Sequence, residues 1–558
     1  MRKKNLVLVA TAMVLALVGA LAGMLRAQPQ GAIALTGRVS SAAEPVMEGV
    51  VVSAKRVGST ITVSVVSDAQ GRYRFPAARL GPGTYALQIR AVGYDLAGPT
   101  RATVVAGRTT IADLRLRKTA HLEDQLSNAE WMISIPGTDE QKRALLDCTG
   151  CHTLQRIVDS YHTADDFLHN VLPRMENYAN MSFWLHPQPF KNGRAGRSGF
   201  VNEQFAEYLA SINQSKGPRT WPLRTFPRLK GASTHVIITT YDLPRRTIEP
   251  HDVIGSDDGM IWYSDFGEQY LGMLDPKTGK VTEFRVPEIK PGYLTGSLEL
   301  EQDPGGMLWL ANMYQGGISR FDPKTRTFKQ WAVQPAQHPE FTQESMVMPL
   351  HDNVDGKVWT NNQDDHSLRR LDVASGTWET FGPFSYTDGT NRKLNFNSYG
   401  IVSDAKNTVW LFDFPHAAIA HFDGKTFKVI PTPTAHSRPR RGRVDDSTGL
   451  FWFAEYGANQ IGVYDTKADN GTIKEYKLPT PWDSPYDVVA DKNGEVWTGS
   501  MWSDRISRLD PKTGAVVEYQ LPTTTNIRRV WVDNKTTPPT LWIGNNHYAS
   551  IIKLETLP

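Results

Sequence analysis

The sequence predicts a mainly β protein of several domains: an N-terminal β-sandwich, a small α-helical domain and a C-terminal seven-bladed β-propeller. At 558 residues the chain is longer than one hydrophobic core normally supports. Its 45 glycines, 35 prolines and 15 tryptophans favour a turn-rich β protein. In the C-terminal part, an apolar strand with a tryptophan recurs every 42 to 51 residues. Four-stranded units at this period are typical of propeller blades.

The N-terminal residues 1–27 are predicted to be a targeting segment. Arg2, Lys3 and Lys4 precede an apolar run over residues 6–24, as in a signal peptide. An uncleaved membrane anchor is the alternative, because the run is close to the length of a membrane span. In both cases the remainder is expected to be periplasmic or secreted. The 61 basic and 58 acidic residues give no case for a nucleic-acid partner.

Residues 31–117 are predicted to form the sandwich. Alternating apolar residues such as Tyr85 and Leu87 indicate half-buried strands, and residues 68–71 and 81–83 indicate turns. The stretches GVVVSA, SDAQGRYRF and LGPGTYALQIRAVGY resemble the carboxypeptidase regulatory-like domain. The resemblance implies a transthyretin-like, carbohydrate-binding-like sandwich that serves adhesion or positioning.

The only two cysteines of the chain stand in the motif Cys148-Thr149-Gly150-Cys151-His152. This spacing is the attachment signature of c-type haem, because each thiol adds to one porphyrin vinyl group and the histidine becomes the proximal iron ligand. Three alternatives remain. A redox disulfide would need a βαβ context that is not evident, a zinc site would need two more soft ligands, and the match could be chance.

The motif lies within residues 120–216, for which three helices are predicted, over TDEQKRALLDCTGCHTL, TADDFLHNVLPRMENY and NEQFAEYLASIN. This order resembles a single-haem cytochrome c domain. The resemblance implies one-electron transfer with a redox protein partner. Met175 and Met181 are the candidates for the sixth iron ligand, with His162 and His169 as weaker alternatives.

A proline- and arginine-rich linker over residues 217–232 leads to the propeller at 233–558. Each predicted blade carries one strand tryptophan: Trp262, Trp309, Trp359, Trp410, Trp452, Trp497 and Trp542. The last blade lacks its own outer strand, and VIITTYDLP, which precedes blade one, is predicted to supply it and so close the ring.

The blades resemble the virginiamycin B lyase (streptogramin lyase) family, most closely over FWFAEYGANQIGVYDTKADNGTIKEYKLPTP. The resemblance implies opening of a cyclic lactone ester by elimination, with Mg²⁺, a histidine base and glutamates. Glu249, His251 and Asp265 stand at the family's spacing in blade one, with aspartate in place of the last glutamate. In the blade of Glu455, Arg441 stands where that histidine is expected.

The residue three positions after each blade tryptophan is polar in all seven blades: Asp265, Asn312, Asn362, Asp413, Glu455, Ser500 and Asn545. Equivalent positions form a ring about a propeller axis. The three carboxylates of Asp265, Asp413 and Glu455 are therefore candidates for binding a cation, Mg²⁺ or Ca²⁺. The alternative is that strand ends at a wet rim are polar in any case.

The sequence thus predicts an exported haem c protein for one-electron transfer. Its propeller is expected to bind a polysaccharide or small molecule at the channel mouth. Two alternatives stay open: a streptogramin lyase-like C–O lyase, and a non-catalytic binding or adhesion protein. Whether the propeller catalyses any reaction is left undecided.

Overall fold

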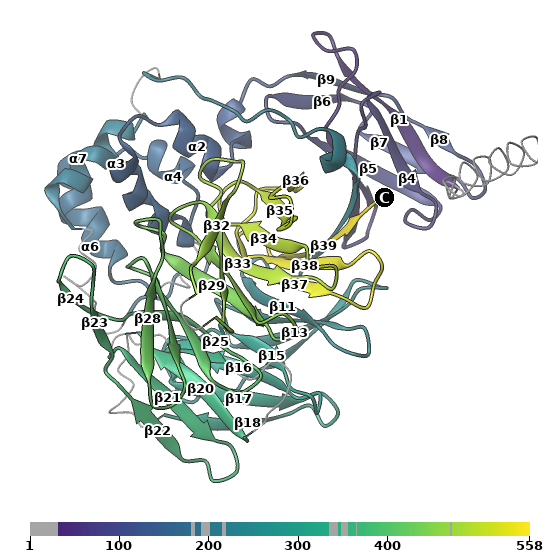
Figure 1. Cartoon of the computed structure of the whole chain (residues 1–558). Helices are drawn as coiled ribbons and strands as arrows, with labels where there is room; N and C mark the ends of the chain where they lie inside the picture. Colours follow the sequence, from purple (N-terminus) through teal and green to yellow (C-terminus); the bar gives the residue numbers. More distant parts are fainter. Residues whose placement is uncertain are drawn as a thin grey trace, which may run out of the picture.

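The computed structural model describes residues 32–179, 185–190, 201–214, 219–333, 344–347, 355–363, 365–468 and 471–558 (Figure 1). The predicted targeting segment 1–27 and Met181 lie outside the described residues. Within the described ranges, no helix is long and apolar enough to span a membrane.

The N-terminal domain is a sandwich of two sheets, as predicted. Its strands are β1 (Ile33–Ser41), β2 (Val51–Arg56), β3 (Ile61–Val66), β4 (Arg72–Pro76), β5 (Gly83–Arg90), β6 (Tyr94–Gly98), β7 (Arg101–Val104), β8 (Thr110–Ile111) and β9 (Leu114–Lys118). One sheet has the order β4-β1-β9-β6 with β8 beside β1, and the other contains β3-β2-β5-β7. Buried aromatic and branched residues such as Tyr73, Phe75 and Leu114 fill the space between them.

The C-terminal part is a propeller, also as predicted, and seven four-stranded antiparallel units can be followed through the described residues. The first three blades are β11–β14 (Pro250–Gly255, Ile261–Asp265, Tyr270–Asp275, Lys280–Arg285), β15–β18 (Leu300–Gln302, Leu308–Asn312, Gly317–Asp322, Thr327–Ala332) and β19–β22 (Glu344–Val347, Lys357–Asn362, Ser367–Asp372, Trp378–Phe381). A hairpin, β23 (Ser385–Thr387) and β24 (Lys393–Asn395), precedes the fourth blade.

The next three blades are β25–β28 (Ser398–Ser403, Val409–Asp413, Ala418–Phe422, Phe427–Pro431), β29–β32 (Pro439–Asp445, Leu450–Glu455, Gln460–Asp465, Lys474–Lys477) and β33–β36 (Pro485–Ala490, Val496–Ser500, Arg505–Leu509, Val516–Gln520). Blade seven contains β37 (Ile527–Asp533), β38 (Thr540–Asn545) and β39 (Ser550–Thr556). Its fourth strand is β10 (Val236–Asp242), the segment before blade one. This confirms the predicted ring closure.

Strand β10 has a second partner that the sequence did not reveal. Its other edge pairs with β3 of the sandwich, so that β37-β38-β39-β10-β3-β2-β5-β7 is one continuous sheet. Side chains on adjacent positions of β10 enter different cores: Ile237 packs in the sandwich and Ile238 in blade seven. The sandwich is therefore joined to the propeller through a shared strand.

The segment before the propeller is built from short helices: η1 (Leu122–Gln125), α2 (Asn128–Ser134), α3 (Asp139–Arg143), η2 (Ala144–Gly150), α4 (Gln155–Val158), α5 (Ala164–Asp166), η3 (Phe167–Val171), α6 (Leu172–Met175) and α7 (Glu203–Ile212). Two further 3₁₀ turns are η4 (Gly231–Thr234) and η5 (Met313–Gln315). The hydroxyls of Thr138 and Thr163 cap the starts of α3 and α5, each accepting the backbone N–H three residues on.

The prediction of a separate helical domain needs correction. The helices share one hydrophobic core with propeller residues, among them Tyr456, Tyr486 and Trp502. The apolar faces of these helices are therefore covered by propeller side chains as well as by one another. Polar contacts fasten the same interface, including Ala129 N–H to Trp502 O at 2.9 Å and Tyr456 O–H to Leu146 O at 2.7 Å.

Candidate functional site

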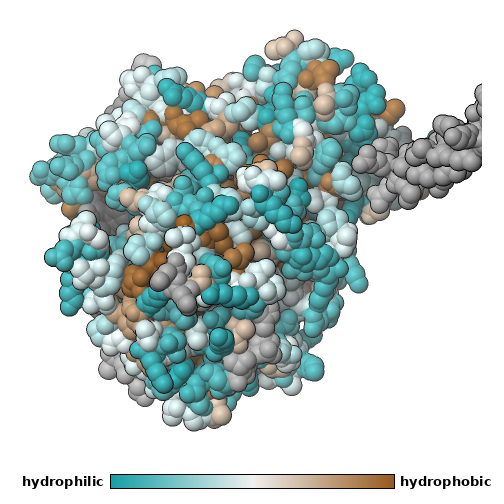
Figure 2. Space-filling view, viewed as in Figure 1, coloured by the Kyte–Doolittle hydropathy of each residue, from teal (hydrophilic) through white to brown (hydrophobic). Residues whose placement is uncertain are grey.

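A cavity of about 1020 Å³ lies between the short helices and the propeller. Both cysteines and His152 line its helical side, and Tyr399 and Arg440 are among the residues that line its propeller side. Figure 2 shows a largely hydrophilic surface on which apolar side chains gather near the middle of the view, where helices meet propeller. The predicted haem motif thus faces a chamber that two parts of the fold build together.

Propeller side chains hold the haem-motif loop in place. Asn526 Nδ2 donates to Thr149 O at 3.2 Å, and Arg528 Nη2 donates to Gly150 O at 3.3 Å. A third contact pairs Arg438 with Asp147 at 2.7 Å, just before the motif. The loop between the cysteines is therefore anchored to the propeller through its backbone carbonyls, which leaves the motif's side chains to the cavity.

Cys148 and Cys151 are both free thiols in this structure. Burial raises the pKa of each thiol to about 12, so both are neutral at physiological pH. No group of three His, Cys, Asp or Glu side chains able to hold a metal ion occurs among the described residues. The zinc alternative therefore finds no ligand set in the described part of the chain.

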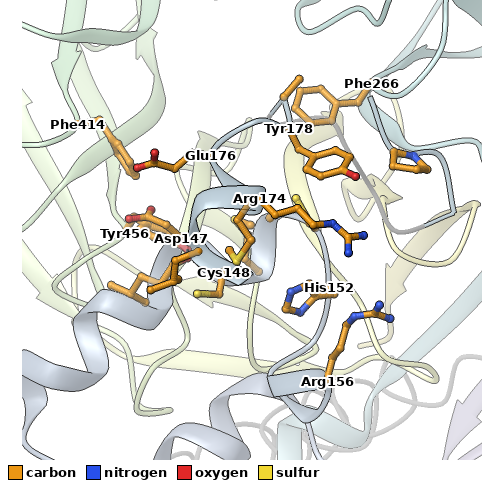
Figure 3. Close-up of a pocket in the computed structure, with 18 of the residues that line it drawn as sticks. Asp147, Cys148, His152, Arg156, Arg174, Glu176, Tyr178, Phe266, Phe414 and Tyr456 are labelled. Atoms are coloured by element: carbon orange, nitrogen blue, oxygen red, sulfur yellow. The ribbon is translucent and has the colours of Figure 1, made fainter. Parts of the chain in front are cut away.

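His152 is held as a neutral imidazole with a defined tautomer. Its Nδ1 lies 2.9 Å from the carbonyl oxygen of Thr153, and because a carbonyl only accepts, Nδ1 carries the proton. Burial lowers the pKa of His152, which favours the neutral ring. Figure 3 shows Cys148 and His152 together on the cavity wall. A neutral ring with Nε2 unprotonated is the form that ligates iron or other metals.

The candidates for a sixth ligand separate in the structure. Met175, at the end of α6, and His162 line the same cavity as His152. Met175 has 40% of its surface exposed. His169 is absent from this lining and instead contacts the Asp165 carbonyl through Nδ1 at 3.2 Å.

Within the predicted blade-one group of Glu249, His251 and Asp265, the structure gives Asp265 and His251 different hydrogen-bond partners. The Asp265 carboxylate accepts the backbone N–H groups of Glu249 and Gly267, and Arg245 Nη2 lies 3.1 Å from it. Burial raises the pKa of Asp265 to about 7. His251 is fully buried, and burial lowers its pKa to about 3. Asp265 therefore caps a loop, while His251 has other partners.

Those partners form a directed hydrogen-bond chain. Arg440 Nη2 donates to the Tyr399 hydroxyl at 3.0 Å, and the hydroxyls of Tyr399 and Tyr486 are 2.6 Å apart. The Tyr486 hydroxyl lies 3.2 Å from His251 Nε2, and His251 Nδ1 lies 2.7 Å from the Asp252 carboxylate. Arg440 can only donate, and the ionised carboxylate of Asp252 can only accept. Each hydrogen bond in the chain therefore has its donor on the side of Arg440.

The negative charge of Asp252, at the inner end of this chain, is stabilised by two arginines. Burial alone would raise the pKa of Asp252, but the guanidinium groups of Arg441 and Arg529 hold it well below its ordinary value. Arg441 Nη1 lies 3.1 Å from Asp252, and Arg529 Nη1 lies 2.6 Å from it. His251 thus lies between a buried ion network and a tyrosine pair of which Tyr399 lines the cavity.

Strand register explains which residues converge at the mouth. In five blades, a residue of the first strand pairs with the polar-ring residue of the second strand. The next residue of the first strand then turns inward; these five residues are His251, Tyr399, Arg440, Tyr486 and Arg528. Pro250 pairs with Asp265, 15 positions on, whereas Pro439 pairs with Glu455, 16 positions on. The counterpart of His251 in blade five is therefore Arg440 and not Arg441, because that blade's turn is one residue longer.

The polar ring predicted to bind a cation serves the loops of its own blades. Asp413 accepts from Asn397 N–H at 3.2 Å and lies 2.9 Å from His416 Nδ1, and Glu455 accepts from Gln460 Nε2 at 3.0 Å. Burial raises the pKa of Glu455 to about 8, so it is largely protonated at neutral pH. These carboxyl groups do not meet as a metal-binding group in the described structure.

Two family models match the chain. The carboxypeptidase regulatory-like domain matches residues 34–117, and the virginiamycin B lyase family matches residues 390–556. Over these residues the chain is similar to the carboxypeptidase regulatory-like domain and to the virginiamycin B lyase family. Neither of these two models covers the helical residues 120–216.

Solved propellers are similar over the C-terminal part. A streptogramin B lyase shares 21% identity, covers 59% of this chain and 100% of its own, and has a TM-score of 0.50. A virginiamycin B lyase from Staphylococcus aureus shares 20% identity over 58% of this chain and 100% of its own, with a TM-score of 0.48. At these identities the likeness concerns the fold alone. No curated protein matches the chain.

Proposed function

We propose that this is an exported c-type haem protein, with haem c in the cavity between the short helices and the propeller. One observation carries the proposal: Cys148, Cys151 and His152 line a single cavity of about 1020 Å³. Cofactor clefts have volumes of roughly 300–1,000 Å³, so there is room for a porphyrin. The haem would supply a one-electron couple at its iron.

The residues present fit this group. Two neutral thiols, Cys148 buried and Cys151 partly buried, suit conversion to thioethers, which carry no charge. The Thr153 carbonyl orients His152 so that Nε2 is the available donor. Met175 or His162 would approach the iron from the cavity. The haem would exchange its electron with a redox protein partner.

The first test is covalent attachment. The full-length protein from a host with haem-attachment machinery should be coloured, show a sharp reduced α-band and have a mass increased by one haem. Replacing both Cys148 and Cys151 with serine should prevent thioether formation, so that any bound haem becomes extractable by acid-acetone. Thr149→Ser, within the same loop, is the matched control and should keep the haem. Colourless wild-type protein with the mass of the bare polypeptide would contradict the proposal.

A second prediction concerns the sixth ligand. Met175→Ala should remove the weak red band expected of a methionine-ligated oxidised haem and lower the reduction potential. His162→Ala should leave that band in place. His169→Ala is the control, because its side chain is not among those lining the cavity. The opposite pattern, with the spectrum sensitive only to His162→Ala, would assign the ligand to the imidazole.

The second candidate function is lactone opening by a virginiamycin B lyase-like propeller, and the family match over residues 390–556 favours it. Elimination needs a base that reaches an acidic C–H. His251 is fully buried with both ring nitrogens engaged, and its pKa is near 3. We therefore expect depsipeptide lactone opening, assayed with and without Mg²⁺, to be absent or weak. Turnover lost in His251→Ala would reverse this order of preference.

A further inference from the structure

Arg440 is a buried cation at the propeller side of the cavity. It comes from β29, is 9% exposed and lines the cavity directly. Its guanidinium carbon lies close to four aromatic ring centroids: Tyr486 at 4.2 Å, Tyr456 at 4.5 Å, Phe414 at 4.7 Å and Tyr399 at 4.8 Å. The cation is thus surrounded by rings rather than by water.

The polar contacts of Arg440 do not balance its charge. Nη2 donates to the Tyr399 hydroxyl, Nη1 lies 3.6 Å from the Met501 sulfur, and buried Nε has no partner among the described residues. No carboxylate lies within salt-bridge distance of it in the described structure, whereas the adjacent Arg441 pairs with both Asp252 and Glu299. An ionised group buried without a counter-charge is costly.

Arg528 adds a second positive charge at the same cavity. It is 3% exposed, and its Nε donates to Asn526 Oδ1 at 2.7 Å. Its guanidinium carbon lies 5.1 Å from the Phe266 ring centroid. No salt bridge joins it to a carboxylate in the described part of the chain. Two buried guanidinium groups therefore face one chamber whose wall also offers the apolar rings of Phe414 and Phe266.

We propose that this end of the cavity binds the carboxylate of an organic ligand, with Arg440 as the principal counter-ion and the aromatic wall receiving the ligand's planar body. Guanidinium and carboxylate match in charge and in planar geometry. The carboxylate has two possible sources: a side chain of a porphyrin held in the cavity, or a separate small molecule that enters beside it. The charge argument uses neither cysteine, so the site does not depend on the haem proposal.

Benzoate is the probe for a separate ligand, and neutral benzamide of the same shape is its control. In calorimetric titration of the full-length protein, benzoate should bind at least tenfold more tightly than benzamide. Arg440→Gln should weaken benzoate binding at least tenfold, and Arg440→Lys should restore part of it. Arg438→Gln is the matched control: Arg438 lines the same cavity but is already paired with Asp147, so its loss should matter less than threefold.

Melting in anion-poor buffer shows whether Arg440 is merely structural. Arg440→Gln should melt no lower than wild type there, because it removes an unbalanced charge, and it should lose the rise in melting temperature that benzoate gives wild type. A lower melting temperature that is the same with and without benzoate would overturn the proposal. Arg440→Lys keeps the positive charge and serves as the second variant if Arg440→Gln does not fold.

The haem-loaded protein separates the two sources. If a porphyrin carboxylate occupies the site, benzoate should not bind, and Arg440→Gln should shift the reduction potential. If the ligand is a separate molecule, benzoate should bind the loaded protein while the potential of ligand-free Arg440→Gln matches wild type. If benzoate does not bind and the reduction potential of Arg440→Gln equals that of wild type, the carboxylate site is overturned. Protein without haem contradicts the proposed function but leaves the benzoate arm intact.

Discussion

Replacing Ile238 with alanine should lower the free energy of unfolding by about 2–5 kcal/mol, the range found for large-to-small changes at fully buried isoleucines. Ile238 is 0% exposed and packs in blade seven with Ile552 and Leu554. Its strand β10 is the fourth strand of that blade and also the partner of β3 in the sandwich. A cavity here weakens the closure of the ring, so the effect should exceed that of an ordinary strand position.

The stronger variant Ile238→Asp places a charge in the same core and should detach β10. The edge of β39 would then be exposed, and the protein should aggregate. Ile111→Ala is the matched control, because Ile111 is 74% exposed and its loss should stay within about 0.5 kcal/mol. Urea unfolding followed by tryptophan fluorescence measures the differences. An Ile238→Ala protein as stable as the Ile111→Ala protein would show that β10 does not close the ring.

The second large effect is the pH dependence of stability that His251 contributes. Burial lowers its pKa from the ordinary 6.5 to about 3 in the folded protein. Between these values the unfolded chain binds a proton that the folded protein does not, so stability falls as pH falls. The slope for one group is about 1.4 kcal/mol per pH unit. Above pH 7 the contribution is complete and constant.

His251→Gln removes this titration while keeping a donor for Asp252 and an acceptor for Tyr486. The difference in unfolding free energy between wild type and this variant should therefore be largest above pH 7 and shrink steadily from pH 6.5 to pH 4. Comparing this variant with wild type at every pH cancels the buried carboxyl groups, such as Glu455, that titrate in both proteins. A constant difference for His251→Gln would mean that the histidine is not held neutral.

Several features could be predicted from the sequence because they depend on local patterns. Strand alternation around Tyr85 and the recurring blade tryptophans reflect side-chain periods that the backbone imposes on each segment separately. The helix starts at Thr138 and Thr163 follow from capping contacts within four residues. The missing strand of blade seven could be predicted because, in a closed propeller, each blade needs all four of its strands.

The candidate site was only partly predictable for the opposite reason. The motif Cys148 to His152 is contiguous, so it can be recognised in the sequence as a candidate site. The cavity that it faces is built jointly by the helical segment and the propeller, which lie far apart in the sequence. Counting residues misplaced the counterpart of His251, because one extra turn residue in blade five shifts the register to Arg440.

Neighbouring residues are enough to predict the order of the parts, the kind of fold at each end and the CxxCH motif at Cys148 to His152. The assembled fold adds three facts: β10 belongs to two sheets, His251 contacts Tyr486 and Asp252, and Arg440 is buried among aromatic rings. These facts depend on segments far apart in the chain meeting at one point. Burial, charge and hydrogen bonding at that point are properties of the assembled fold.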